Sequence, residues 1–155
     1  LTIEHKGVIA QQFRGAIGNR IFGCDDCLAI CPWNKFATRA KEQKLAAKDG
    51  TDLPPLEKLL QLDEDGFRDY FAGTPVRRAG YERFMRNTLI AAGNSGDETL
   101  VPTISIFLES RVSLVRGMAI WALSQLMFGQ DWAVLKQQYL PSELNESVRA
   151  EWNNS

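Results

Sequence analysis

All three cysteines lie in one short stretch, Gly23-Cys24-Asp25-Asp26-Cys27-Leu28-Ala29-Ile30-Cys31-Pro32-Trp33-Asn34, with the spacing C-x2-C-x3-C and a proline after the last. Thiolates are soft ligands that suit iron–sulfur clusters, zinc and copper(I). In the bacterial run C-x2-C-x2-C-x3-C-P, the fourth cysteine ligates the other cluster of a two-cluster protein. The three cysteines match the last three of that run. The pattern therefore predicts that Cys24 and Cys27 share one cluster and that Cys31 serves a second.

Other uses of clustered thiols fit this stretch less well. Structural zinc takes four ligands, and the single histidine, His5, lies far back in the sequence. A disulfide framework normally has an even number of cysteines in a small secreted domain. Three buried structural thiols remain an alternative, although they would not explain the spacing or the Cys31-Pro32 pair. A 4Fe–4S cluster takes four cysteines, so these three cannot complete even one.

The spacing of the cysteines also predicts local structure. Positions i, i+3 and i+7 share one face of a helix, so we expect a helix across the stretch. Asp25 and Asp26 are expected in its first turn, where negative charge suits the helix dipole. Pro32 is expected to end it, because proline restricts the residue before it. Trp33 could shield a cluster from water or be an ordinary core aromatic.

The bulk composition is that of a globular protein. The chain has 155 residues, 45% hydrophobic and 24% charged, and its net charge of −1 favours no particular partner. No apolar run reaches the length of a membrane span, and no signal-peptide pattern is present. Clustered thiols without a secretion signal predict a cytoplasmic location. Because the chain begins at Leu1, in mid-element, we expect it to be a fragment whose upstream part carries more cysteines.

Three parts are predicted along a mostly all-α chain. Residues 1–37 are expected to be the end of an iron–sulfur module, and residues 38–54, which mix positive charges with Ala, Gln, Asp and Gly, to be a linker. From residue 55 onward everything reads as helix, and residues 85–92 resemble residues 115–122 and, more weakly, 148–152. Repeats near this length indicate stacked helical hairpins, so residues 55–155 are predicted to form HEAT-like repeats.

The best copy of the repeat gives a detailed prediction. Ser113 is expected to cap its helix, and turns are expected at residues 93–96 and 129–130. One face of the helix is expected to be buried, because apolar residues recur along it at helical spacing: Val115, Met118, Ala119, Ala122 and Leu126.

Two groups of arginines stand out in this part. One arginine recurs at the same place in each repeat, which favours a structural role for Arg86, Arg116 and Arg149. The other group is local to one repeat and interleaved with the aromatic residues Tyr81 and Phe84. Arginine suits phosphate and aromatic rings can stack on bases. This second group is therefore a candidate nucleic-acid contact: Arg77, Arg78 and Arg83.

The sequence resembles the epoxyqueuosine reductases. The resemblance is most specific around the cysteines, and it extends over most of the chain through these motifs: Ile-Gly-Asn-Arg-Ile-Phe-Gly-Cys-Asp-Asp-Cys at 17–27, Cys-Pro-Trp-Asn-Lys-Phe at 31–36, Gly-Thr-Pro-Val-Arg-Arg at 73–78, Arg86-Asn87 and Gly93-Asn94. Ala10 stands where a proline is expected in relatives, which is a minor departure at a helix start.

The resemblance implies a specific activity. Members of this family combine a corrinoid-binding domain, a ferredoxin-like module with two 4Fe–4S clusters, and HEAT-like repeats. They reduce epoxyqueuosine to queuosine in the anticodon loop of tRNA, and they need an external electron donor. By analogy, Cys24 and Cys27 would join two upstream cysteines at one cluster and Cys31 would complete the other, with tRNA contacts at Arg77, Arg78 and Arg83. Cobalamin and the catalytic acid would belong to upstream sequence, so no catalytic residue is assigned here, the fragment alone is expected to be inactive, and a monomer is expected.

Two other functions are compatible with parts of the sequence. One is a different corrinoid iron–sulfur reductase, related to reductive dehalogenases, although the repeats and the arginines argue against it. The other is a non-catalytic helical-repeat module that binds a protein. Salt-sensitive binding of tRNA would distinguish the favoured function from the second alternative.

Overall fold

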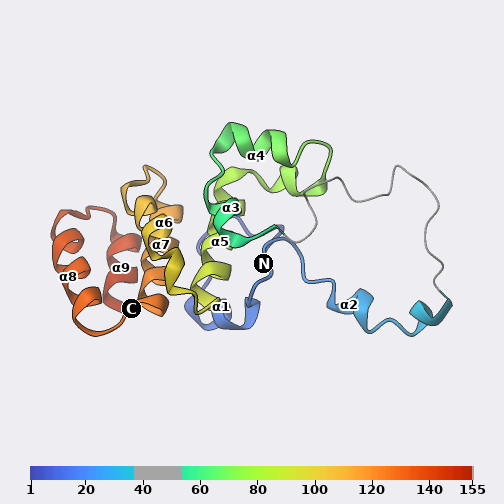
Figure 1. Cartoon of the computed structure of the whole chain (residues 1–155), viewed down its shortest axis with the longest axis horizontal. Helices are drawn as coiled ribbons and strands as arrows, with labels where there is room; N and C mark the ends of the chain where they lie inside the picture. Colours follow the sequence, from blue (N-terminus) through green and yellow to red (C-terminus); the bar gives the residue numbers. More distant parts are fainter. Residues whose placement is uncertain (37–53, 155) are drawn as a thin grey trace.

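The computed structural model describes residues 1–36 and 54–154, and every regular element in these two ranges is a helix. Figure 1 shows a row of packed helices with the cysteine stretch extending from one end as an arm. The described helices are α1 (Gln11–Ile17), α2 (Asp26–Ala29), η1 (Pro32–Phe36), α3 (Leu56–Leu60), α4 (Glu64–Tyr70), η3 (Pro75–Ala79), α5 (Tyr81–Asn94), η4 (Glu98–Leu100), α6 (Val101–Ser105), η5 (Ile106–Glu109), α7 (Ser113–Leu126), α8 (Gly129–Tyr139), η6 (Leu140–Ser142) and α9 (Glu146–Asn154). The prediction of a mostly all-α fold is confirmed for these ranges.

The centre of the molecule is the pair α5 and α7. A Cβ atom added at Gly93 would lie 2.8 Å from Cζ3 of Trp121 and 2.9 Å from Cα of Ala122. The two helices therefore approach so closely that only glycine fits at this point. Gly93 and Asn94 are the last residues of α5, so the prediction of a turn beginning at residue 93 is wrong. The chain turns after them, where Gly96 has a φ of 68°.

The predicted repeat positions fall on α5, α7 and α9. All five residues of the predicted α7 face are buried, as expected for an apolar stripe between packed helices. The prediction that Ser113 caps α7 is wrong, because Ser113 is the first residue of the helix and Val112 precedes it as N-cap without a side-chain bond. Gly129 has a φ of 62° and begins α8, so only the entry to that helix fits the predicted turn.

The segment before the cysteines belongs to the same core as the helical pairs. Ile9 and Ile17 are buried in the cluster of apolar side chains that includes Leu89 of α5 and Trp121 of α7. In Figure 1, α1 lies beside the lower part of α5. The predicted linker, residues 38–54, lies outside the described residues except for Pro54. The division of the chain into three parts stays a prediction.

The apolar helices of the described ranges are short. Within residues 1–36 and 54–154, no helix is both long and apolar enough to cross a membrane.

Candidate iron–sulfur site

The cysteine stretch is two short helical turns and not one helix. Cys24 precedes α2, Cys27 lies inside it, and Cys31 lies between α2 and η1. The prediction of one helix with all three thiols on one face is therefore wrong. Asp25 adopts a left-handed conformation with a φ of 51°, which breaks the helix on the side of Cys24, and aspartate is among the residues that tolerate it.

The three thiols are not bonded to one another. Cys24 and Cys27 are exposed, Cys31 is half-buried, and all three are free cysteines. Among the residues that the structure describes, no three His, Cys, Asp or Glu side chains gather closely enough to hold a metal ion. The donor chemistry fits an iron–sulfur cluster, because soft thiolates are its ligands. The described residues do not by themselves form a complete ligand set.

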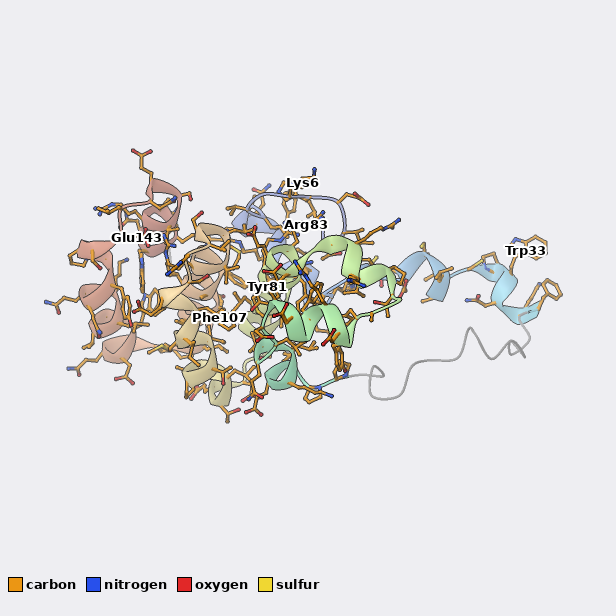
Figure 2. The ribbon with its side chains drawn as sticks, turned by 90° about the horizontal axis from the view of Figure 1, so that it is seen from above. Lys6, Trp33, Tyr81, Arg83, Phe107 and Glu143 are labelled. Carbon is orange, nitrogen blue, oxygen red and sulfur yellow. The ribbon has the colours of Figure 1, made fainter. Side chains whose placement is uncertain are left out.

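Large apolar residues lie close to the cysteines in sequence, and the described part of the chain does not cover their side chains. The exposed fractions are 62% for Leu28, 83% for Ile30, 72% for Trp33 and 64% for Phe36. Figure 2 shows Trp33 far out on the arm and away from the packed helices. Trp33 touches Phe36 at 5.6 Å between ring centroids. Trp33 is therefore not a core aromatic of the described structure.

The backbone immediately before Cys24 is held by the helical body. The Asn87 side chain donates from Nδ2 to the carbonyl oxygens of Thr2 and Ile21, both at 2.7 Å. The Gly23 amide donates to Oγ1 of Thr2 at 3.0 Å. The N-terminal end of the cysteine stretch is thus anchored to α5.

A pocket of about 530 Å³ lies next to this point and includes Cys24 in its lining. Leu1, Phe13 and Ile17 contribute apolar walls to it, and Arg20 and Asp26 contribute polar ones. Arg20 and Asp26 form an exposed ion pair at 3.2 Å. A largely apolar wall beside a thiolate limits the access of water to a bound cluster, which affects its reduction potential.

Arg86 fastens the N-terminal segment to α5. It is fully buried and donates to the carbonyl oxygens of His5 at 2.7 Å, Gly7 at 2.8 Å and Leu1 at 3.3 Å. Each of these carbonyl groups gains a charge-assisted hydrogen bond. The predicted structural role of Arg86 is confirmed, but its partner is the N-terminal segment and not an adjacent repeat.

Arg86 stays positively charged although its side chain is buried. Burial, and secondarily the positive charge of Arg83, lowers the pKa of Arg86 to about 10. This value is still well above neutral, so the guanidinium group stays protonated under ordinary conditions. All three hydrogen bonds to the carbonyl groups therefore come from a charged donor.

The other two recurring arginines meet at Glu143, in the loop before α9. Arg116 forms a two-pronged ion pair with Glu143, at 2.8 and 2.9 Å, and also donates to the carbonyl oxygen of Ser110. Arg149 donates to the backbone carbonyl oxygen of Glu143 at 2.9 Å. The hydrogen bonds from Arg116 lower the pKa of the Glu143 carboxyl group. The predicted structural role is confirmed for Arg116, which ties α7 to the loop before α9, whereas Arg149 is exposed and contacts only the loop before its own helix.

The candidate nucleic-acid residues lie at η3 and the start of α5. Arg77 and Arg78 are exposed. Arg83 is half-buried and donates to the carbonyl oxygens of Ile3 and Arg78, both at 3.1 Å (Figure 2). Arg83 thus links the backbone of η3 at Arg78 to the N-terminal segment.

The aromatic residues beside these arginines do not form a stacking surface. Phe84 is 2% exposed and packs with Phe67 and Phe71 in the core. The hydroxyl group of Tyr81 donates to the carbonyl oxygen of Leu62 at 2.9 Å, and burial raises the pKa of Tyr81. The candidate surface therefore consists of guanidinium groups without exposed rings between them.

Sequence reasoning did not assign Asn87, Asn94 or Arg14. Asn94 donates to the carbonyl oxygens of Arg14 and Gly18, at 2.8 and 3.0 Å. The Arg14 guanidinium is buried against Glu151 at 2.6 and 2.7 Å. A usable signal existed for the two asparagines, because Asn87 and Asn94 are seven residues apart and so share a helix face.

Comparison with known proteins gives matches over most of the chain. A family described as "4Fe-4S double cluster binding domain" matches residues 1–34. Proteins named epoxyqueuosine reductase are similar to this chain. That of Xanthomonas campestris is 44% identical over 126 residues, 81% of this chain and 36% of its own length. That of Pseudomonas aeruginosa is 40% identical over 126 residues, 79% of this chain and 34% of its own length.

Solved structures give the same match. A structure of epoxyqueuosine reductase with an epoxyqueuosine-modified tRNA-Tyr stem loop superposes with a TM-score of 0.88 at 25% identity, over 96% of this chain and 40% of that one. The chain spans about a third of the length of the curated relatives that it matches. Over that length, by sequence and by fold, this chain belongs to the epoxyqueuosine reductase family.

Proposed function

We propose that this chain is part of an oxidoreductase that reduces epoxyqueuosine to queuosine in the anticodon loop of tRNA. The observation that carries the proposal is the cysteine stretch, which lies inside the matched 4Fe–4S double cluster binding domain of a chain 44% identical to a named epoxyqueuosine reductase. The chain supplies three thiolates, fewer than two 4Fe–4S clusters require, so activity belongs to the whole protein. That protein works in the cytoplasm as a monomer, with an external electron donor and a cobalamin held mainly by sequence outside this chain.

Within the ferredoxin-like part, residues 1–37, we assign the ligands by cluster. Cys24 and Cys27 bind one cluster and Cys31 binds the other. The short α2 supports this division, because it separates Cys31 from Cys24 and leaves both exposed thiols at its beginning. Bound clusters supply one-electron transfer to the reducing cofactor. The residues of this chain hold the thiolates in place and provide the apolar wall beside Cys24.

The test is a set of cysteine substitutions in the full-length protein. Cys24→Ala and Cys27→Ala should each remove one cluster, and Cys31→Ala should damage the other. Iron and sulfide per chain, with electron paramagnetic resonance spectra of each variant, measure the losses. Identical spectral changes from all three variants contradict the division, and an unchanged iron content in all three contradicts cluster binding by this stretch.

The helical part, residues 55–155, is proposed to form HEAT-like repeats that hold the tRNA. Arg77, Arg78 and Arg83 are its phosphate contacts, and the first two carry the larger share because Arg83 already donates to two carbonyl groups. A relative solved with a modified tRNA stem loop supports this choice of partner. Each phosphate that an arginine neutralises makes binding more sensitive to salt.

Binding of tRNA at several salt concentrations tests this assignment. Arg77→Ala and Arg78→Ala should each weaken binding and lower the salt slope by about one unit. Arg111→Ala is the matched control, because Arg111 is exposed but lies outside residues 77–83. Equal losses in all three variants would mean that the chain attracts RNA without using η3.

A further inference from the structure

The side chain of Asn87 is fixed in one orientation in the core. Asn87 is 1% exposed, and Arg86 donates from Nε to its Oδ1 at 2.9 Å. Because the oxygen is occupied in this way, the two hydrogens of Nδ2 point in the other direction. They meet the carbonyl oxygens of Thr2 and Ile21, each at 2.7 Å.

These hydrogen bonds continue to the residue before Cys24. The Oγ1 of Thr2 accepts a hydrogen bond from the Gly23 amide at 3.0 Å. The carbonyl oxygen of Thr2 in turn accepts the bond from Asn87 of α5, so Thr2 connects α5 to Gly23. Gly23 has a φ of 76°, a conformation that side-chain-bearing residues rarely adopt. The backbone is thus fixed at residues 21 and 23, on the approach to Cys24.

We propose that Asn87 is a positioning residue for the cluster ligand Cys24, acting through Ile21, Thr2 and Gly23. This inference rests on the proposed cluster binding by the cysteine stretch. Partners that orient a metal ligand affect both the retention of the metal and its electronic properties. Loss of the amide leaves the carbonyl groups of Thr2 and Ile21 without their donor, and Cys24 can then shift relative to the cluster.

Asn94 provides a matched control on the same helix. It also donates from Nδ2 to two carbonyl oxygens, those of Arg14 and Gly18. Both asparagines therefore stabilise the N-terminal segment by the same kind of contact. Only Asn87 holds the residues that lead directly into Cys24, whereas the carbonyl groups held by Asn94 belong to α1 and its end.

The experiment compares Asn87→Ala with Asn94→Ala in the cluster-loaded full-length protein. Asn87→Ala should change the electron paramagnetic resonance spectrum of the cluster bound by Cys24 and speed its loss to a chelator by on the order of ten-fold. Asn94→Ala should leave the spectrum as in the wild type. If the two variants give the same spectrum and the same rate of cluster loss, the inference is overturned.

A second variant covers the case in which Asn87→Ala does not fold. Thr2→Val keeps the shape of this buried side chain and removes the acceptor for the Gly23 amide. It should shift the same spectrum and leave the melting temperature close to that of the wild type, and an unchanged spectrum in Thr2→Val overturns the inference. Failure of the proposed function looks different, because the wild-type protein itself would then hold no cluster.

Discussion

Residues 1–23 and residues 24–36 are neighbours in sequence, but they are stabilised in different ways. In the first region, Ile9 and Arg14 are each 1% exposed, and α5 and α9 bind its backbone and side chains. In the second region every residue except Cys31 is exposed. Its hydrogen bonds are local, such as the bond from Asn34 to the carbonyl oxygen of Leu28 at 2.6 Å.

This difference in stabilisation suggests that the two regions have different roles, although the 4Fe–4S double cluster binding domain match includes residues of both. The first region takes its order from the helical body, since many of its contacts are with distant residues, such as Asn87 with Ile21 and Arg14 with Glu151. The second region keeps its thiols and apolar side chains available for partners other than the described core. We therefore expect substitutions in the first region to affect folding, and those in the second to affect cluster binding.

The largest effect is expected at Arg14. Its guanidinium group is buried, pairs with Glu151 and lies over the ring of Trp121 at 5.4 Å. Arg14→Ala leaves Glu151 in a largely buried position without its partner, which costs about 3–5 kcal/mol. Arg20→Ala removes the exposed pair with Asp26 in the second region and a bond of 3.3 Å to the carbonyl oxygen of Ile17, and it should cost about 0–1 kcal/mol. Urea unfolding measures both, and equal losses would mean that the buried contact with α9 stabilises the chain no more than the exposed pair that joins the two regions.

The next effect concerns the close approach of α5 and α7. Gly93→Ala forces a methyl group against Trp121 and the backbone of Ala122, and overpacking of this kind costs about 1–3 kcal/mol. Gly15→Ala in α1 is the control, because a Cβ there meets nothing within 4 Å. It should stabilise the protein by up to about 1 kcal/mol through helix propensity. Thermal melting of the pair tests both signs, and a stabilising Gly93→Ala would refute the close contact.

A pH-dependent effect is expected at Arg116. Arg116→Met should cost about 1–3 kcal/mol near neutral pH, because Glu143 loses its charged partner. Arg116 lowers the pKa of Glu143 in the folded state, so this stabilisation is present above the unfolded value of about 4.3 and is lost as the pH falls through the lower folded value. The difference in the free energy of unfolding between wild type and variant should therefore be smaller at pH 3 than at pH 7. A larger difference at pH 3 would contradict the lowered pKa of Glu143.

The smallest effect is expected on the arm. Ile30→Ser replaces a side chain that is 83% exposed and should change the free energy of unfolding by no more than about 0.5 kcal/mol. Ile9→Val, at a site that is 1% exposed, should cost about 0.5–1.5 kcal/mol although it removes only one methylene group. A larger loss from Ile30→Ser in metal-free protein would show that the arm does contribute to the folded body.

The periodic and local features of this fold could be predicted from the sequence. The apolar stripe of α7 follows from helical spacing, and the cysteine motif from its own pattern. The two helical turns of the cysteine stretch could not be predicted. The cysteine spacing favours one helix, but the left-handed conformation of Asp25 breaks it. Gly93 was predicted in a turn, since the close approach of another helix leaves no mark on the local sequence.

The partners of long-range contacts could not be predicted from the sequence either. Arg14 and Glu151 are 137 residues apart, and neither has a local pattern that selects the other. The recurrence of Arg86 did indicate a structural role, but the sequence did not indicate that its partners are carbonyl groups of the first seven residues. Backbone acceptors carry no side-chain signature, so contacts to them appear only once the chain is folded.

The pairing of Arg14 with Glu151 has a consequence for how the protein can evolve. Stacked helical pairs normally contact only their neighbours, so a pair can be added or removed without disturbing distant ones. Here α1 reaches α9 directly, and Gln11 also donates to the carbonyl oxygen of Asn154 at 3.3 Å. An inserted or deleted pair between α5 and α9 would pull these contacts apart. The direct contacts of α1 with α9 therefore constrain how many helices can lie between them.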